Sequence, residues 1–264
     1  MISKGTGTVL LVALTVVIVL AVLFAPRVAQ PPSYHQFADA RSWLGVSDFE
    51  NVISNLPFAI FGIWGLLFLS RHTGTPTFLD PRERLPYFVF FIGVFLTAFG
   101  SAYYHLLPGN SRLVWDRLPM TIAFMSLVSA LIAERIDLTF GLRLLVPLLL
   151  IGIASVLHWH LSEVNGKGDL RFYAAVQVYA VAVLLLLVLL PSGYTRTADL
   201  VWVGASYLLA KLLEATDRPI YALGHYVSGH TLKHLAAGLS GYFVLRMLSK
   251  RRPIEAPLEA THAT

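Results

Sequence analysis

The sequence of 264 residues contains no cysteine and few charged residues. Without cysteine, the chain can form no disulfide, no thiolate metal site and no cysteine nucleophile. A metal site would therefore depend on histidine, carboxylate, hydroxyl or backbone ligands. Charged residues make up 13% of the chain and hydrophobic residues 56%, and the mean hydropathy is +0.67. This composition excludes a water-soluble globular protein and predicts an integral membrane protein.

Long apolar runs recur along the whole sequence, each bounded by proline, glycine or charge. A helix needs about 20 apolar residues to cross a bilayer core. The eight predicted spans are Thr8–Ala25, Phe49–Ser70, Leu85–Leu106, Trp115–Glu134, Leu144–Leu161, Phe172–Leu190, Leu200–Leu213 and Thr231–Leu248. Together they use about 160 residues, which leaves short loops and two tails and no room for a soluble domain.

We therefore predict an all-α integral membrane protein, in which a seven-helix bundle follows one extra N-terminal membrane anchor. Three parts are expected: the anchor and linker at 1–33, the seven-helix domain at 34–249, and a disordered cytoplasmic tail at 250–264. The first apolar run could instead be a signal peptide. Its apolar part exceeds the usual 7–15 residues and no good cleavage site follows, which favours an uncleaved anchor.

Basic residues are distributed unevenly between the loops, and membrane proteins keep most of them in the cytoplasm. If the N-terminus is cytoplasmic, eleven basic residues lie inside and seven outside. The eleven are Lys4, Arg71, Arg82, Arg84, Arg135, Arg143, Arg196, Arg246, Lys250, Arg251 and Arg252. The seven are Arg27, Arg41, Arg112, Arg117, Lys167, Arg171 and Arg218. We interpret the net charge of +5 as a sign of membrane topology, and no nucleic-acid binding is predicted.

This orientation brings the polar ends of three spans to the non-cytoplasmic side of the membrane. They are the end at His105, the start at Asp116 and the start at "SGHTLKH". We expect a multi-pass protein of a bacterial inner membrane, with its active site towards the non-cytoplasmic side.

Histidine forms the most informative polar group in the sequence. An ionisable side chain at the centre of a membrane helix costs about 2.5–3.5 kcal/mol, so each one is a candidate for function. His230 and His234 are four residues apart, on one helical face, where they can bind one ion. Alone, this pair is equally typical of interfacial histidines bonded to water or backbone carbonyls. His105, at the same membrane depth, adds the third ligand of an open zinc site.

Asp116 and Ser101 flank this predicted site. Asp116 is either the N-cap of a helix that continues through Pro119, or a general base that takes a proton from water activated by the metal. Ser101 lies one turn before His105. It is either a small packing residue beside Gly100, or a hydroxyl that donates to a developing oxyanion.

Two further polar groups have structural interpretations. Lys211 and Glu214 are three residues apart, which predicts an ion pair on one helix face. His158 and His160 are two apart and cannot share a helical face. Together with Trp159, they are typical of an interfacial belt.

The pattern Ser101-x-x-x-His105, Asp116 and His230-x-x-x-His234 resembles the signature of the alkaline ceramidase family. That family belongs to a superfamily of seven-span membrane hydrolases that also includes the adiponectin-receptor-like proteins. The resemblance implies zinc on the three histidines, with Asp116 activating water and Ser101 assisting. The family reaction is hydrolysis of the ceramide amide, which releases a sphingoid base and a fatty acid.

The resemblance covers roughly residues 39–249 and includes the stretch "NVISNLPF" on the first core span. Some members of the family also carry calcium on acidic residues just before that span. By resemblance, the calcium ligands here would be Asp48, Asp39 and Glu50, although the acidic cluster is thin. The extra N-terminal anchor departs from the seven-span pattern.

Several functions therefore compete. A retinal protein would need a buried lysine opposite a carboxylate, and Lys233 lies instead in the first turn of its span, between two histidines. A transporter would show two related halves with broken helices, which the sequence lacks. We predict a zinc-dependent amide hydrolase acting on a membrane lipid, either a ceramide or an N-acyl amino lipid, with no obligate protein partner. The alternative is an adiponectin-receptor-like receptor or lipid sensor with the same metal site.

Overall fold

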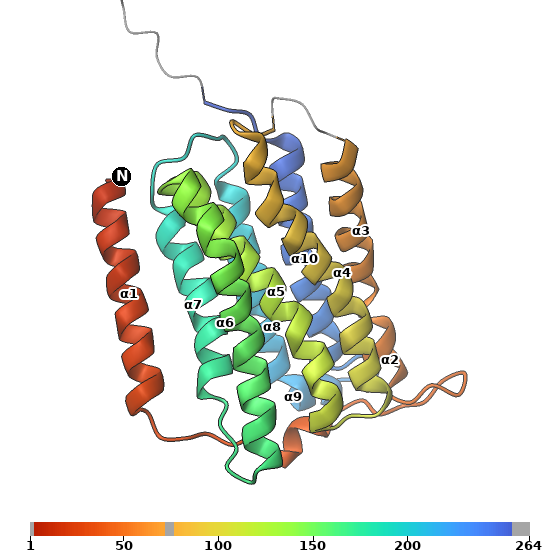
Figure 1. The fold of residues 1–264 in the computed structure, drawn as a ribbon. Helices are drawn as coiled ribbons and strands as arrows, with labels where there is room; N and C mark the ends of the chain where they lie inside the picture. The colour runs from red at the N-terminus through yellow and green to blue at the C-terminus, as the bar shows by residue number, and fades with distance from the viewer. Residues whose placement is uncertain (1–2, 72–76, 255–264) are drawn as a thin grey trace, which may run out of the picture.

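A computed structural model of the chain describes residues 3–71 and 77–254. These residues are almost entirely helical, and the only β-type pairings among them are two isolated bridges. The helices run alongside one another as a single bundle (Figure 1). The prediction of an all-α protein is confirmed.

Ten α-helices and two short 3-10 helices make up the described residues. They are α1 (Lys4–Phe24), η1 (Pro32–His35), α2 (Phe49–Ile53), α3 (Leu56–Arg71), η2 (Pro81–Glu83), α4 (Arg84–Leu106), α5 (Asn110–Arg135), α6 (Leu138–Val164), α7 (Arg171–Val188), α8 (Ala198–Ala215), α9 (Asp217–Ala222) and α10 (Gly229–Lys250). Every predicted span coincides with one long helix, except Phe49–Ser70, which is divided between the short helix α2 and helix α3.

Among the described residues, six helical segments are long and apolar enough to cross a membrane. They are α1, α2 with α3, η2 with α4, α5, α6 and α7. The chain is therefore a multi-pass membrane protein. Helices α8 and α10 pack closely against each other within the bundle but carry more polar side chains. The expected count of seven core helices agrees only roughly with the structure for this reason.

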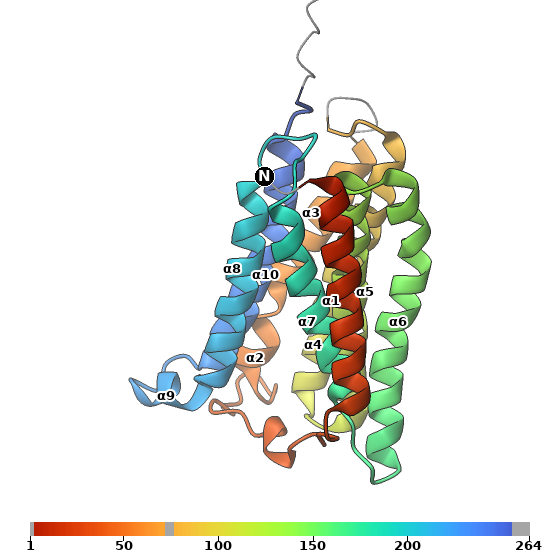
Figure 2. The same cartoon turned by 90° about the vertical axis from the view of Figure 1, so that its left-hand side faces the viewer.

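The predicted anchor, α1, lies at the edge of the bundle beside α7 (Figure 2). Only 11% of its most apolar window is buried, so most of its surface is free to face lipid. The Thr15 hydroxyl lies 3.2 Å from the Tyr179 hydroxyl of α7. An appended helix in this position leaves the core helices undisturbed.

The chain end that follows α10 is ordered further than expected. The Arg251 side chain is buried, with Nη1 2.5 Å from Oε1 of Glu134. The Thr195 amide donates to the Arg252 carbonyl at 2.9 Å, and the Ile254 amide donates to the Gly193 carbonyl at 2.8 Å. The predicted disordered tail is therefore wrong for residues 250–254, because Lys250 is the last residue of α10 and a buried ion pair and backbone bonds hold 251–254. Residues 255–264 lie outside the described residues.

Helix α5 is the most buried of the six candidate spans, and α4 packs closely along it. At Gly100, a Cβ atom would lie 2.0 Å from the carbonyl oxygen of Trp115. Only glycine permits this approach. It brings Ser101, the next residue on α4, beside the turn of α5 that carries Asp116.

Gly100→Ala is expected to lower the free energy of unfolding by about 1–3 kcal/mol, because the new methyl group would overlap the Trp115 carbonyl. Gly109→Ala is the matched control, since a Cβ there meets nothing within 4 Å. Thermal unfolding of both variants in one detergent measures the difference. Equal midpoints would show that the α4–α5 contact adapts freely.

Candidate metal centre

The three predicted histidines come together at the end of the bundle where α4 finishes and α10 begins. His105 Nε2 lies 3.3 Å from His234 Nε2 and 3.3 Å from His230 Nε2. One ligand atom from each of the three residues lies within 4.8 Å of the other two. All three side chains are buried.

This spacing matches the spacing of nitrogen ligands on one metal ion. Two nitrogens bound to a tetrahedral zinc at about 2.05 Å are about 3.3 Å apart. Of the described residues, only these histidines form such a group, and none of its ligands is a carboxylate. Imidazole binds zinc, copper, iron and nickel. The geometry therefore indicates a metal centre, and zinc is one of the metals it suits.

Hydrogen bonds from neighbouring residues orient one of the three rings and fix the backbone of a second ligand. The Ser54 hydroxyl donates to the Asn51 carbonyl at 3.2 Å, so it accepts the Nδ1 proton of His234 at 2.8 Å. The Nε2 lone pair of His234 is then free for a metal. The backbone amide of His230 donates to Oδ1 of Asp217 at 2.8 Å, which fixes the start of α10.

The linker between α1 and α2, residues 25–48, covers the metal centre from the end of the bundle. The Phe37 ring lies 4.7 Å from the His105 ring and 4.4 Å from the His230 ring, measured between centroids. The Ala38 amide donates to Oδ2 of Asp217 at 2.8 Å. Asp217 therefore holds the linker and α10 together. Sequence reasoning missed Phe37, because no periodic pattern in a loop indicates a contact with distant helices.

Asp116 and Ser101 lie beside each other next to the centre. Their side chains are close enough for the Ser101 hydroxyl to hydrogen-bond to the Asp116 carboxylate, and both are buried. Helix α5 begins at Asn110, after Gly109 in the N-cap position. Asp116 is therefore in the second turn and Pro119 is inside the helix. The N-cap interpretation of Asp116 is wrong.

Asp116, Ser101 and His234 line one cavity of about 250 Å³. We call it the polar cavity. Its other polar side chains are Gln30, Tyr34, Thr97, Arg117, Tyr173, Gln177, Tyr207, Lys211, Glu214 and Lys233. The cavity therefore brings a metal ligand, a carboxylate and a hydroxyl to one enclosed space.

The predicted pair of Lys211 and Glu214 is present and includes a third charge. Lys211 Nζ contacts Oε2 of Glu214, and Lys233 Nζ lies 3.2 Å from Oε1. The Tyr34 hydroxyl also donates to Glu214 at 3.3 Å. Lys233 is thus occupied by an ion pair with α8, which is unlike the free amine that a Schiff base requires.

The predicted interfacial belt is only partly correct. The His158 side chain is half exposed, with Nε2 3.7 Å from Oδ2 of Asp169. Arg171 holds the pKa of Asp169 well below its usual range, at about 2, through hydrogen bonds. Trp159, however, is fully buried, and its ring lies 4.0 Å from Arg117 Cζ. Trp159 is not an interfacial residue, because its ring packs inside the bundle against Arg117 of the neighbouring helix α5.

The residues predicted to bind calcium do not form a cluster of their own. Asp39, Asp48 and Glu50 are absent from the metal-competent groups of the described residues. Burial raises the pKa of Asp39, but hydrogen bonds from Arg41 to both carboxylate oxygens outweigh it, and the pKa lies below its usual value. Burial and the charge of Asp39 raise the pKa of Asp48. Calcium stays a prediction that these contacts do not support.

No protein-family model matches this chain, and no curated protein does either.

Purified protein is expected to carry about one equivalent of a transition metal. His105→Ala and His234→Ala should lose most of it, because each removes one of three ligands. Ser54→Ala should keep the fold and weaken metal affinity about 10- to 100-fold, since the His234 ring loses its orienting partner. Elemental analysis and competition with a chelator measure both effects.

His158→Ala is the matched control, because this half-exposed imidazole lies outside the cluster. Its metal content should equal that of the wild type. Metal-free wild-type protein, after purification and incubation with zinc, would contradict the assignment.

Proposed function

We propose that the protein is a zinc-dependent membrane hydrolase that cleaves the amide of ceramide-like lipids into an amine and a fatty acid. The observation that carries the proposal is the convergence of three imidazole nitrogens, because one of the three ligands, His234, also lines the cavity that contains the Asp116–Ser101 pair. The resemblance of these residues to the alkaline ceramidase pattern supports the same reaction.

His105, His230 and His234 would hold the metal. When bound, zinc supplies Lewis-acid polarisation of the amide carbonyl and makes water a stronger nucleophile near neutral pH. Asp116 accepts the proton that water loses as it attacks the carbonyl carbon. It then returns that proton to the amide nitrogen as the carbon–nitrogen bond breaks, and the amine leaves neutral.

Ser101 has one hydroxyl proton to donate. Before reaction this proton can be shared with the Asp116 carboxylate, which orients the base. Once Asp116 has taken a proton from water, its carboxyl group is neutral and accepts the hydrogen bond from Ser101 less strongly. Ser101 is then able to donate to the oxygen of the amide, where negative charge develops.

A lipid substrate is supported by a second, apolar cavity of about 110 Å³ that shares part of its lining with the polar cavity. The shared residues are Phe58, Thr97, Met120, Tyr207 and Ala237. The rest of its lining is almost entirely aliphatic or aromatic. An acyl chain placed there would put its amide at the polar cavity.

Sideways entry from the bilayer is supported by a surface hollow of about 420 Å³ between α7 and α8. Four of its residues, Ala174, Gln177, Tyr207 and Lys211, also line the polar cavity. The Tyr207 hydroxyl donates to Oε1 of Gln177 at 2.6 Å, so one hydrogen bond joins the two helices at this opening.

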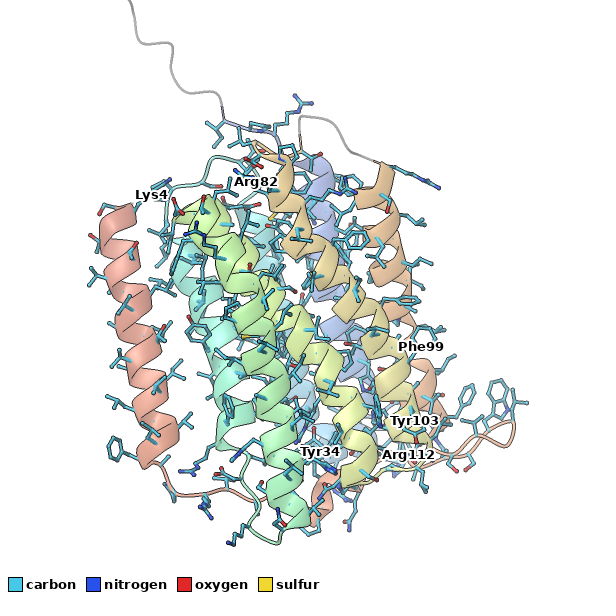
Figure 3. The ribbon with its side chains drawn as sticks, viewed as in Figure 1. Lys4, Tyr34, Arg82, Phe99, Tyr103 and Arg112 are labelled. Carbon is cyan, nitrogen blue, oxygen red and sulfur yellow. The ribbon has the colours of Figure 1, made fainter. Side chains whose placement is uncertain are left out.

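The predicted orientation gives the site a non-cytoplasmic location in a bacterial inner membrane. Lys4 and Arg82 lie at one end of the bundle, and Tyr34, Tyr103 and Arg112 at the other (Figure 3). Tyr34 lines the polar cavity, so the site is at the end opposite Lys4.

Asp116→Asn should lower the rate of hydrolysis of a short-chain ceramide about 10²- to 10⁴-fold, because the amide cannot accept the proton. Since Asp116 does not cap α5, the helix start should be unaffected and metal content unchanged. Ser101→Ala should cost less and also retain the metal. Initial rates of the metal-loaded proteins measure these effects.

Asp80→Asn, near the opposite end of the bundle, is the control and should hydrolyse the lipid at the wild-type rate. Asp116→Asn with wild-type activity would exclude Asp116 as the base.

Membrane orientation is testable because the chain has no cysteine. Ser111→Cys, exposed near the start of α5, should react with an impermeant thiol reagent added to intact cells. Ser249→Cys, exposed near the end of α10, should react only after the membrane is opened. The reverse pattern would place the site on the cytoplasmic face.

A further inference from the structure

Arg117 is a buried cation that makes no ion pair with a carboxylate within residues 3–71 and 77–254. Its side chain is 4% exposed and lines the polar cavity. Nη2 donates to Oε1 of Gln30 at 2.6 Å, whereas Nη1 has no hydrogen-bond partner among the described residues. Arginine stays protonated in proteins, so the cavity contains a full positive charge with an unused donor.

Aromatic rings hold this guanidinium in place without using its donors. Cζ lies 4.0 Å from the centroid of Trp159, 4.4 Å from Tyr173 and 5.6 Å from Tyr34. The ring faces attract the cation and restrict its movement. The guanidinium is therefore oriented before any ligand arrives.

Two other buried arginines, at the opposite end of the bundle, have more hydrogen-bond acceptors than Arg117. Arg251 is also buried among three aromatic rings, and there the Glu134 carboxylate lies 2.5 Å from Nη1. Arg135, a third buried arginine, donates to two backbone carbonyls and a hydroxyl. The only hydrogen-bond acceptor for the Arg117 guanidinium among the described residues is the amide oxygen of Gln30, and Arg117 lines a cavity.

The charge of the cavity lining favours an anion. Three cations, Arg117, Lys211 and Lys233, line it with two carboxylates, Asp116 and Glu214. Glu214 is already engaged by both lysines. The lining therefore carries one more positive than negative charge before any metal is added, and Arg117 is its only cation that makes no ion pair with a carboxylate of the described residues.

The position of Arg117 matches the amine side of a bound lipid. Arg117 follows Asp116 directly, and its neighbours Gln30 and Tyr34 belong to the linker that closes this end of the cavity. The apolar cavity adjoins the other end, at residues such as Thr97. An acyl chain in the apolar cavity, with its amide near Asp116, directs the group on the nitrogen towards Arg117.

We propose that Arg117, oriented by Gln30, binds a carboxylate on the amine side of the substrate. The preferred substrate class is then the anionic N-acyl amino acids, with a neutral ceramide as a weaker substrate. This proposal rests on the proposed amide hydrolysis for the reaction itself, but the anion subsite exists independently of it.

The test compares N-palmitoylglycine with N-palmitoylglycinamide, which has nearly the same size and no charge. The metal-loaded wild type should show a kcat/KM for the glycine lipid about 10- to 100-fold higher. Arg117→Gln should remove this preference by lowering the value for the anionic lipid alone. Arg117→Lys keeps the positive charge and should retain part of the preference for the anionic lipid.

A second variant tests the subsite without removing the buried Arg117 side chain, and so separates loss of the subsite from misfolding. Gln30→Glu gives Arg117 the carboxylate that the native chain lacks, with almost no change of shape. The fold and metal content should be kept, while the preference for the anionic lipid falls. Arg112→Gln is the control, since this arginine stacks on Tyr103 and does not line the cavity.

Binding gives a readout that needs no turnover. In the Asp116→Asn background, N-palmitoylglycine should bind more tightly than N-palmitoylglycinamide, and Gln30→Glu should abolish the difference. Equal binding of the two lipids, or an equal loss for both in Arg117→Gln and in Gln30→Glu, would overturn the subsite even if ceramide is hydrolysed. Preferential, Arg117-dependent binding without hydrolysis of any amide would keep the subsite and overturn the proposed function.

Discussion

Close backbone contact between neighbouring helices is the constraint on which the site depends. Two glycines make it possible, and each immediately precedes a site residue. A Cβ at Gly100, before Ser101, would meet the Trp115 carbonyl at 2.0 Å, and one at Gly229, before His230, would meet the Leu213 carbonyl at 2.3 Å. The first contact sets α4 on α5 and the second sets α10 on α8. Because the metal ligands come from α4 and α10, both contacts help to set the positions from which the three imidazoles converge.

Several of the polar residues that distinguish α8 and α10 from the more apolar helices also build the site. Glu214 on α8 binds Lys233 of α10 and so joins the two helices inside the bundle. Lys233 lies between His230 and His234 in sequence, and its ion pair places the Glu214 carboxylate beside the ammonium. Neutral imidazoles are required for metal binding. The pairing therefore offsets part of a positive charge that lies near the metal ligands.

Sequence patterns predicted the long helices and the histidine cluster, because both follow from local rules. Apolar runs reveal spans, and the spacing of His230 and His234 places them on one face. The predicted start of α5, at Trp115, was wrong because the first turn of the helix is polar and resembles a loop. For the same reason Asp116 was considered as an N-cap. The burial of Trp159 and the position of Phe37 depend on partners far away in the chain. No local pattern encodes such partners. The three histidine ligands could be predicted because their positions in the spans place them at the same depth in the membrane.

The linker has a consequence for how a metal ion would be exchanged. Phe37 covers the rings of His105 and His230, and Asp217 ties the linker to the start of α10 through two backbone amides. On that side, Phe37 would separate an ion held by the histidines from the surroundings. Its escape would require either displacement of the linker or passage along the polar cavity, past His234. The dissociation kinetics of the ion would then report the motion of a loop, and a saturated lipid site would slow the remaining route.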